Sequence, residues 1–187
     1  TDKVILVTGG AHRVGKSIAA ALAREGAQVV ITYHSSKDQA MQTVKEISST
    51  NKSVLALPCD QQAPEQITLA MDEINSKFGR LDGLVNNASI MQETPLLEVT
   101  PQQWDQTFNT NVRGPFFFIQ AAAKLMHAGG VIINILDESA TAPTRFYVHH
   151  SASKAALRML TLSTALALAP GIRVNAVLPG PVLMPDG

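Results

Sequence analysis

The chain has 187 residues, with 15 Lys and Arg against 15 Asp and Glu, so its formal net charge is zero. This length is enough for one α/β domain with a sizeable core. The balanced charge gives no reason to expect nucleic acid or an anionic membrane as a partner, and no apolar stretch is as long as a membrane span. The single cysteine, Cys59, cannot form an internal disulfide, which predicts a cytoplasmic protein.

The first functional signature lies at residues 4–15, where an apolar run ends in the turn Thr8-Gly9-Gly10-Ala11-His12-Arg13-Val14-Gly15. An amphipathic segment follows, so the pattern predicts a strand, a tight turn and a helix. Glycines let the backbone approach a ligand closely, and the N–H groups at the start of a helix favour a phosphate. An ordinary strand-to-helix turn without a ligand is the alternative.

Apolar runs and amphipathic segments alternate along the rest of the chain. The apolar runs predict strands at residues 28–33, 53–58, within 81–89, and at 131–136 and 172–178. The amphipathic segments predict helices at residues 37–47, 64–78, 101–127 and 150–168, the third broken at Gly114-Pro115. This alternation predicts one doubly wound, Rossmann-like α/β domain with a parallel sheet covered on both faces. Ligands of such a sheet bind at the carboxyl ends of its strands.

The residues after the second predicted strand bear on the choice of cofactor. In dinucleotide-binding folds an acidic residue about 20 residues after the glycine turn binds the ribose 2′-hydroxyl of NAD. Here Tyr33-His34-Ser35-Ser36-Lys37 occupies that place, and the first carboxylate is Asp38. Hydrogen-bond donors and positive charge from this segment and from Arg13 suit a 2′-phosphate, so we expect NADP(H) rather than NAD(H). A solvated polar loop is the alternative.

Polar residues also follow the third and fourth predicted strands. Asp60 could accept a hydrogen bond from an adenine amino group, although Asp is also a common turn residue. Asn86-Asn87-Ala88 places small and amide side chains where a nucleotide would pass, although an Asn pair is also a common loop feature.

A candidate reactive centre follows the fifth predicted strand. Asp137 closes that strand, and His150 and Lys154 lie at i and i+4 on one face of the next helix. An acid, an imidazole and an amine at this edge suit general acid–base catalysis, which needs a proton donor tuned by a charged neighbour. A helix-face histidine beside a solvated lysine is the alternative.

Together these stretches closely resemble the short-chain dehydrogenase/reductase family over nearly the whole chain. The glycine turn resembles the family's Thr-Gly-x3-Gly-x-Gly pattern, and Asn86-Asn87-Ala88-Ser89 resembles its Asn-Asn-Ala-Gly pattern. Asn111 resembles the family's helix asparagine, and Asn175 with Pro179-Gly180 resembles its Asn-x-x-x-Pro-Gly ending. The family's Ser, Tyr and Lys correspond to Asp137, His150 and Lys154.

This resemblance implies an NAD(P)-binding domain over residues 1–187 that acts on a small molecule and holds no metal. It implies catalytic roles for Asn111, Asp137, His150 and Lys154. It implies substrate contacts for Ser89, Met91, Asp137 and His150. The residues that it implies for cofactor binding are Gly9, Arg13, Val14, Gly15, Tyr33, His34, Ser35, Asp60, Asn87, Ala88, Ser89, Lys154, Pro179, Gly180 and Val182.

Several positions look like the pteridine reductase branch of the family, which uses NADPH. Arg13, Ser89 and Asp137 stand where most members have Gly, Gly and Ser. Met91 stands near the place where the branch carries an aromatic residue that stacks on the pterin ring, and methionine gives no such stacking. The family's catalytic tyrosine is replaced by His150.

The resulting hypothesis is an NADPH-dependent reductase that transfers a hydride to a small carbonyl or C=N substrate of pteridine-like type. Either the imidazolium of His150 donates the proton, or Asp137 delivers it with His150 assisting. Tyr147, expected in the loop before the helix, does not replace the missing tyrosine. A nucleotide-binding scaffold that lost catalysis with its tyrosine is one alternative, and an NAD-linked alcohol dehydrogenase is another.

The resemblance also bears on assembly and on the end of the chain. Family members usually form dimers or tetramers through the long helix and the helix of His150, so we expect a homodimer or homotetramer. Phe116, Phe117 and Phe118 belong either to that interface or to the core. Members continue past the position of Gly187 with a substrate-covering segment, a helix and a last strand, which we expect to be missing here.

Overall fold

A computed structural model of the chain describes residues 2–48 and 54–180. In these ranges its strands are β1 (Val4–Val7), β2 (Gln28–Tyr33), β3 (Val54–Pro58), β4 (Gly83–Asn86), β5 (Gly130–Ile135) and β6 (Ile172–Val177). Its α-helices there are α1 (Arg13–Arg24), α2 (Lys37–Ser48), α3 (Pro64–Phe78), α4 (Pro101–Phe108), α5 (Gly114–Leu125) and α6 (Val148–Leu168). Every expected strand and helix is present, with boundaries that differ by a few residues.

The strands of the described ranges form one parallel sheet in the order β3-β2-β1-β4-β5-β6. Val7 of β1 lies beside Ile31 of β2 on one side and Val85 of β4 on the other. The strand order reverses between β1 and β4, and the helices that follow these strands, α1 and α5, cover opposite faces of the sheet. Folds of this kind bind ligands in a crevice at the carboxyl edge beside such a reversal. The doubly wound, Rossmann-like sheet is therefore confirmed.

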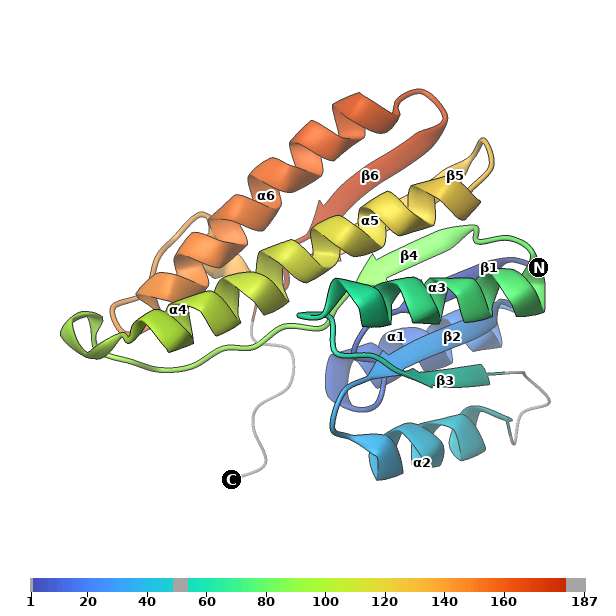
Figure 1. Cartoon of the computed structure of the whole chain (residues 1–187), viewed down its shortest axis with the longest axis horizontal. Helices are drawn as coiled ribbons and strands as arrows, with labels where there is room; N and C mark the ends of the chain where they lie inside the picture. Colours follow the sequence, from blue (N-terminus) through green and yellow to red (C-terminus); the bar gives the residue numbers. More distant parts are fainter. Residues whose placement is uncertain (1, 49–53, 181–187) are drawn as a thin grey trace.

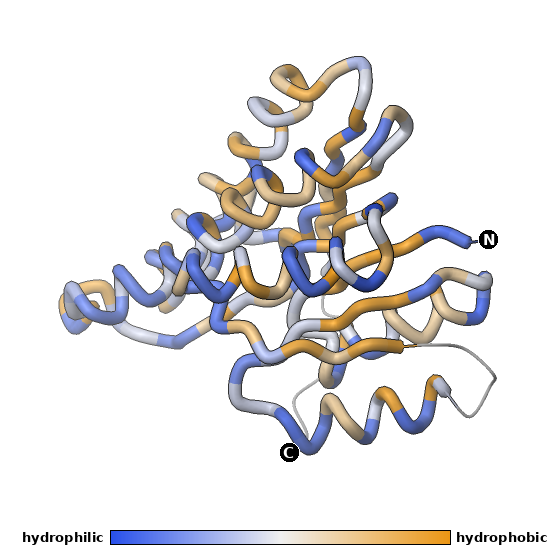
Figure 2. The backbone as a smooth tube through the Cα atoms, turned by 45° about the vertical axis from the view of Figure 1, so that its right-hand side comes forward, coloured by the Kyte–Doolittle hydropathy of each residue, from blue (hydrophilic) through white to orange (hydrophobic). Residues whose placement is uncertain are grey.

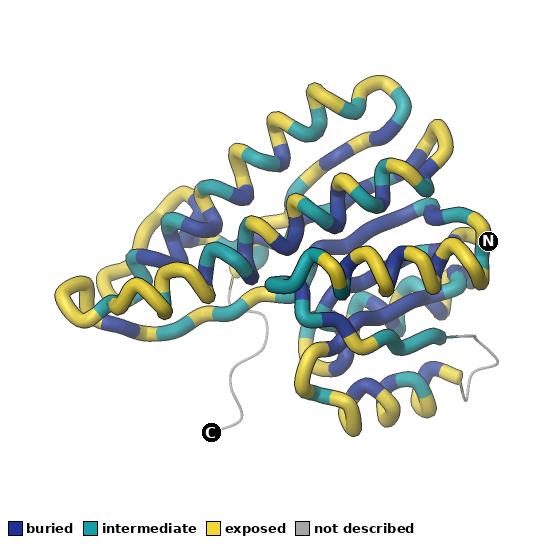
Figure 3. The backbone as a smooth tube through the Cα atoms, in the orientation of Figure 1, coloured by how far each residue is buried: buried dark blue, intermediate teal, exposed yellow. Residues whose placement is uncertain are grey.

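Helices cover both faces of this sheet, and Figure 1 shows α3 and α5 in front of the strands. On one face, Ala19 of α1 and Ala40 of α2 pack in a buried cluster with Ile31 of β2. On the other face, Ile67 of α3 and Phe118 of α5 pack in a second cluster with strand residues. The central strands are hydrophobic (Figure 2) and buried (Figure 3) because both of their faces are covered.

The long helix predicted at residues 101–127 is interrupted. Its start is fixed by a capping box, in which Thr100 Oγ1 accepts a hydrogen bond from the Gln103 amide and Gln103 Oε1 accepts one from the Thr100 amide. The α-helical pattern stops at Phe108, and a π-helical segment, Asn109–Arg113, leads into α5. The break predicted at Gly114-Pro115 thus begins earlier in the chain. A Cβ at Gly114 would lie 2.9 Å from the carbonyl oxygen of Gln61, so α5 begins where only glycine fits.

Apolar side chains on α5 and α6 are divided between the core and the surface. Phe118 is fully buried, whereas Phe116 is 39% exposed. Met159, Leu162 and Leu166 of α6 are also exposed, Leu166 by 83%. The core interpretation therefore holds for Phe118, and Phe116 stays available for an interface. Among the described residues, no helix combines the length and apolar character needed to cross a bilayer.

Candidate active site

The turn between β1 and α1 packs directly against the loop that leaves β4. Gly9 has a φ of 62°, a left-handed conformation that glycine adopts without strain. A Cβ at Gly9 would lie 2.9 Å from Cα of Ala88, and a Cβ at Gly15 would lie 2.6 Å from Nδ2 of Asn87. His12, the N-cap of α1, makes no capping hydrogen bond with its side chain. The first turn of α1 therefore presents backbone N–H groups that this residue does not cap.

Thr8 ties the two loops together. Its Oγ1 accepts hydrogen bonds of 3.0 Å from the amides of both Asn87 and Ala88. The Asn87 amide group donates in return to the carbonyl oxygens of Thr8 at 2.9 Å and Gly9 at 3.1 Å. This role of Thr8 was not predicted from the sequence, where its place just before the first glycine is the only signal for it.

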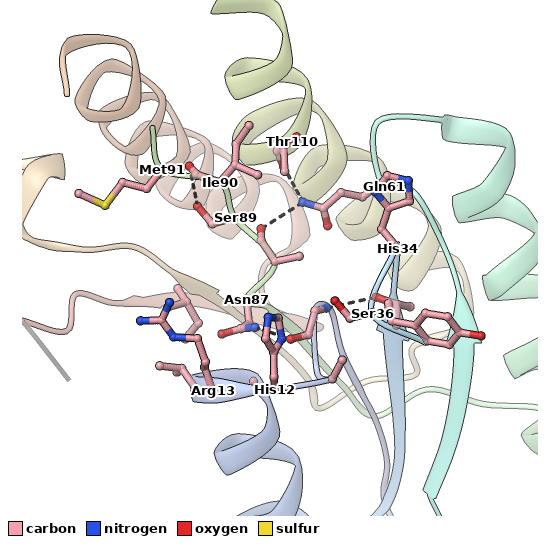
Figure 4. Close-up of a pocket in the computed structure, with 18 of the residues that line it drawn as sticks. His12, Arg13, His34, Ser36, Gln61, Asn87, Ser89, Ile90, Met91 and Thr110 are labelled. Carbon is pink, nitrogen blue, oxygen red and sulfur yellow. Dashed lines mark hydrogen bonds between the residues drawn. The ribbon is translucent and has the colours of Figure 1, made fainter. Parts of the chain in front are cut away.

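Arg13 is held in a left-handed conformation, with a φ of 50°. This conformation costs a non-glycine residue about 1–2 kcal/mol. Arg13 lines the same cleft as His34, Ser35 and Ser36, which come from the loop after β2. Figure 4 shows Arg13, His34 and Ser36 around this cleft. Lys37, also considered as a phosphate ligand, is the first residue of α2 and does not line the cleft.

The loop after β3 contacts both the loop after β2 and the segment beyond β4. Asp60 Oδ2 lies 3.7 Å from Nε2 of His34, and Oδ1 of Asp60 accepts a hydrogen bond from the Gln62 amide. Gln61 is buried, and its Nε2 donates to the carbonyl oxygens of Ala88 at 3.1 Å and Thr110 at 2.6 Å (Figure 4). Both roles predicted for Asp60, as adenine ligand and as turn residue, are compatible with this geometry.

The three residues of the predicted reactive centre do meet. His150 Nε2 lies 2.9 Å from Asp137 Oδ2, and Lys154 Nζ lies 3.8 Å from the same oxygen. Lys154 also donates to the carbonyl oxygen of Ile135 at 3.1 Å. The other oxygen of Asp137 accepts hydrogen bonds from the amide of Ser139, at 3.0 Å, and from its hydroxyl.

Electrostatics differ sharply within this cluster. Burial acts to raise the pKa of Asp137, but the hydrogen bonds from His150 and Ser139 and the charge of Lys154 hold that pKa well below its usual range. Burial lowers the pKa of Lys154, and Asp137 opposes that shift. Asp137 is therefore an anion at neutral pH, held by donors on several sides.

Asn111, in the π-helical segment, fixes the loop after β4. Its Oδ1 accepts from the Ile90 amide at 2.9 Å and the Ser89 hydroxyl at 3.1 Å. Its Nδ2 donates to the Ile90 carbonyl oxygen at 2.9 Å and to Ser153 Oγ at 3.0 Å. Asn111 therefore lies behind the wall of the site, and Ile90, Ser139 and Ser153 join it as partners that sequence patterns did not reveal.

These groups surround a cleft of about 640 Å³ at the carboxyl edge of the sheet. Met91, 58% exposed, lies among its lining residues. Of the predicted site residues, Asn111 does not line the cleft, and Val182 lies outside the described residues. Among the described residues, no group of His, Cys, Asp or Glu side chains is arranged to hold a metal ion. The other predicted site residues all line it: Gly9, Arg13, Val14, Gly15, Tyr33, His34, Ser35, Asp60, Asn87, Ala88, Ser89, Met91, Asp137, His150, Lys154, Pro179 and Gly180.

Characterised proteins match this chain over nearly its whole length. L-rhamnose-1-dehydrogenase of Scheffersomyces stipitis is 39% identical over 187 residues, covering 96% of this chain and 72% of the relative. A 3-oxoacyl-[acyl-carrier-protein] reductase FabG of Staphylococcus aureus is 37% identical over 181 residues, covering 95% of this chain and 74% of the relative.

Solved structures give the same result. A short-chain dehydrogenase of Burkholderia cenocepacia in complex with NADP superimposes with a TM-score of 0.92 at 39% identity, covering 95% of this chain and 74% of the other. A blue fluorescent protein from a metagenomic library in complex with NADPH gives 0.93 at 39% identity, covering 99% and 78%. Residues 3–185 match the family model for short chain dehydrogenases. The chain therefore belongs to the short-chain dehydrogenase/reductase family of oxidoreductases.

Proposed function

We propose that this protein is an NADPH-dependent reductase that transfers a hydride to a small carbonyl or C=N substrate of pteridine-like type. The observation that carries the proposal is one cleft lined by two chemically distinct groups of residues. Arg13 and the loop of His34 form the first group, and Asp137 with Lys154 forms the second. The first group suits a phosphorylated nucleotide, and the second suits proton transfer.

The residues present fit the cofactor. The first turn of α1, without a side-chain cap from His12, suits the pyrophosphate. Arg13 and the donors His34 and Ser35 suit a 2′-phosphate, and the strain accepted at Arg13 supports a functional reason for its charge. By family resemblance, Lys154 would hold the ribose next to the nicotinamide. When bound, NADPH supplies the hydride, and this chain's own residues supply the proton.

The pteridine-like part of the proposal rests on Arg13, Ser89 and Asp137, which line the cleft together. An ionised carboxylate at position 137 suits a flat heterocycle with N–H donors better than the family's serine would, because a carboxylate accepts strong charge-assisted hydrogen bonds. Met91 adds an adaptable apolar contact in place of an aromatic ring.

A second candidate function has one observation in its favour. His150, which by family resemblance takes the place of a phenol, is only 1% exposed, and both of its ring nitrogens contact other residues. Tyr147 is the N-cap of α6, and its hydroxyl donates to Glu93, so it does not fill that place. In this alternative the protein is a scaffold that binds the nucleotide and catalyses no reaction.

A fluorescence titration with NADPH and with NADH tests the cofactor, and NADPH oxidation in the presence of 7,8-dihydrobiopterin or an aromatic diketone tests the chemistry. We expect NADPH to bind more tightly than NADH. Arg13→Gly, which fits the left-handed backbone, should weaken NADPH binding by about tenfold and leave NADH binding unchanged, since a charge-assisted hydrogen bond contributes roughly 1.5–3 kcal/mol. Binding without oxidation of either substrate would favour the scaffold, and binding of neither nucleotide would refute both functions.

We also propose that the protein works in the cytoplasm as a homodimer or homotetramer. The exposed apolar side chains of α5 and α6, Phe116, Met159, Leu162 and Leu166, support a helical interface. Light scattering should report an oligomer that Leu166→Glu weakens. A monomeric wild-type protein would contradict this part of the proposal.

A further inference from the structure

The imidazole of His150 is enclosed by hydrogen-bond acceptors. Its Nδ1 lies 3.0 Å from the carbonyl oxygen of Ile90, and its Nε2 lies 2.9 Å from Oδ2 of Asp137. A carbonyl oxygen can only accept a hydrogen bond, so Nδ1 must carry a hydrogen to make this contact. The amide nitrogen of Asn111, 3.4 Å from Nδ1, already directs its two hydrogens to Ile90 and Ser153, so it does not compete.

The partner of Nε2 is also an acceptor. Asp137 receives hydrogen bonds from Ser139 on its other oxygen and has Lys154 3.8 Å from Oδ2, and both neighbours favour the ionised carboxylate. An ionised carboxylate only accepts, so Nε2 also needs a hydrogen. A neutral ring would turn one lone pair toward an acceptor oxygen. With two acceptors and one ring, the geometry fits an imidazolium.

Neither ring nitrogen is free to meet the substrate, because Nδ1 contacts Ile90 and Nε2 contacts Asp137. Both His150 and Asp137 line the cleft, but His150 is only 1% exposed, whereas the side chain of Asp137 is 29% exposed. The charged or titratable groups facing the ring are Asp137, with Lys154 behind it, and on its own helix the neighbouring His149. Burial and the charge of His150 lower the pKa of His149, so that neighbour stays neutral. Asp137 is thus the one anion among these groups, and its Oδ2 contacts both the ring and the ammonium group of Lys154.

We propose that His150 is a positioning residue that stores the proton for reduction and passes it to the substrate through Asp137. In this step the Nε2–H bond of His150 breaks and an O–H bond forms on Oδ2 of Asp137. The carboxyl O–H then turns to the cleft and gives its proton to the substrate oxygen or nitrogen that has become an anion. His150 is left neutral and regains a proton from water through the exposed Asp137. The inference rests on the proposed function, because it names the proton path of the same site.

The first test requires neither substrate nor cofactor. The protein is labelled with ¹⁵N in its histidine rings, and the His150 signals are assigned by their loss in His150→Gln. At neutral pH we expect both ring nitrogens of His150 to be protonated in the wild type, and one of them to lose its proton in Asp137→Asn. A neutral His150 ring in the wild type, or an imidazolium that persists without the carboxylate, would overturn the inference. Failure of the proposed function is a separate result, seen as absence of NADPH binding.

The second test uses the serine and tyrosine that the family resemblance implies at these positions. Asp137→Ser should lower the rate of NADPH oxidation with an aromatic diketone by about 100-fold, the usual contribution of a positioned acid, because the path from His150 is cut. Adding His150→Tyr to this variant should restore at least about tenfold of that loss, because a phenol reaches the substrate directly. NADPH titrations and thermal melts of all variants report folding and binding separately. Full activity in Asp137→Ser would overturn the relay.

Discussion

The hydroxyl of Thr8 provides the sharpest test of how the cofactor cleft is built. Its side chain is fully buried, and its oxygen accepts from two backbone amides, those of Asn87 and Ala88, at 3.0 Å each. Thr8→Val keeps the shape of the side chain and removes both acceptor contacts. A buried N–H group left without a partner costs about 1–3 kcal/mol. Because these amides are partly buried, we expect the free energy of unfolding to fall by about 2–4 kcal/mol in total.

Urea unfolding followed by circular dichroism measures this change, and an unaltered m-value would show that the denatured state is the same. Thr8→Ser is the matched control, since it keeps the hydroxyl and loses one methyl group, worth about 0.8 kcal/mol. Thr8→Val should also weaken NADPH binding, because the loop of Asn87 lines the cleft. Equal losses of stability in the two variants would refute the reasoning, since packing and not hydrogen bonding would then hold the loops together.

Three further predictions address the glycine turn, the amino ends of β1 and β4, and a buried histidine. Gly15→Ala would place a Cβ against the carbonyl oxygen of Gly9, so titration should show at least about tenfold weaker NADPH binding. Burial acts to raise the pKa of Asp82, but its hydrogen bonds, chiefly the one from Arg80, lower that pKa to about 2. Its stabilisation is therefore present above pH 4 and lost as pH falls through about 2, so Asp82→Asn should cost about 1–2 kcal/mol in urea at neutral pH and nothing near pH 2. His149 is fully buried, and neither of its nitrogens has a partner among the described residues. His149→Leu should raise stability by about 1 kcal/mol at neutral pH. The stability gained by His149→Leu should grow in thermal melts as pH falls below about 6.5. The pKa of His149 is lowered in the folded state, so the unfolded wild type binds the proton more readily and is favoured at low pH.

The fold was predictable because its signals are local. The apolar strands, the Thr100 capping box and the left-handed Gly79 that ends α3 each depend on a few neighbouring residues. Strand order then brings the predicted polar residues to one edge. The partners that hold them could not be predicted in this way. Gln61 and Ser139 have no motif of their own, and their roles arise from where two loops approach each other in space.

The orientation of His150 also depends on contacts between distant segments, and it links two residues, Asp137 and His150, that look separate in the sequence. With serine at position 137, an imidazolium at position 150 would face Lys154 with no anion between them, which is unfavourable in a buried site. With Asp137 present, the same ring gains an acceptor at 2.9 Å and the carboxylate gains a donor that keeps it ionised. A histidine at position 150 is therefore physically compatible with this fold because position 137 carries the charge. Changing either residue alone should disturb the site more than changing both.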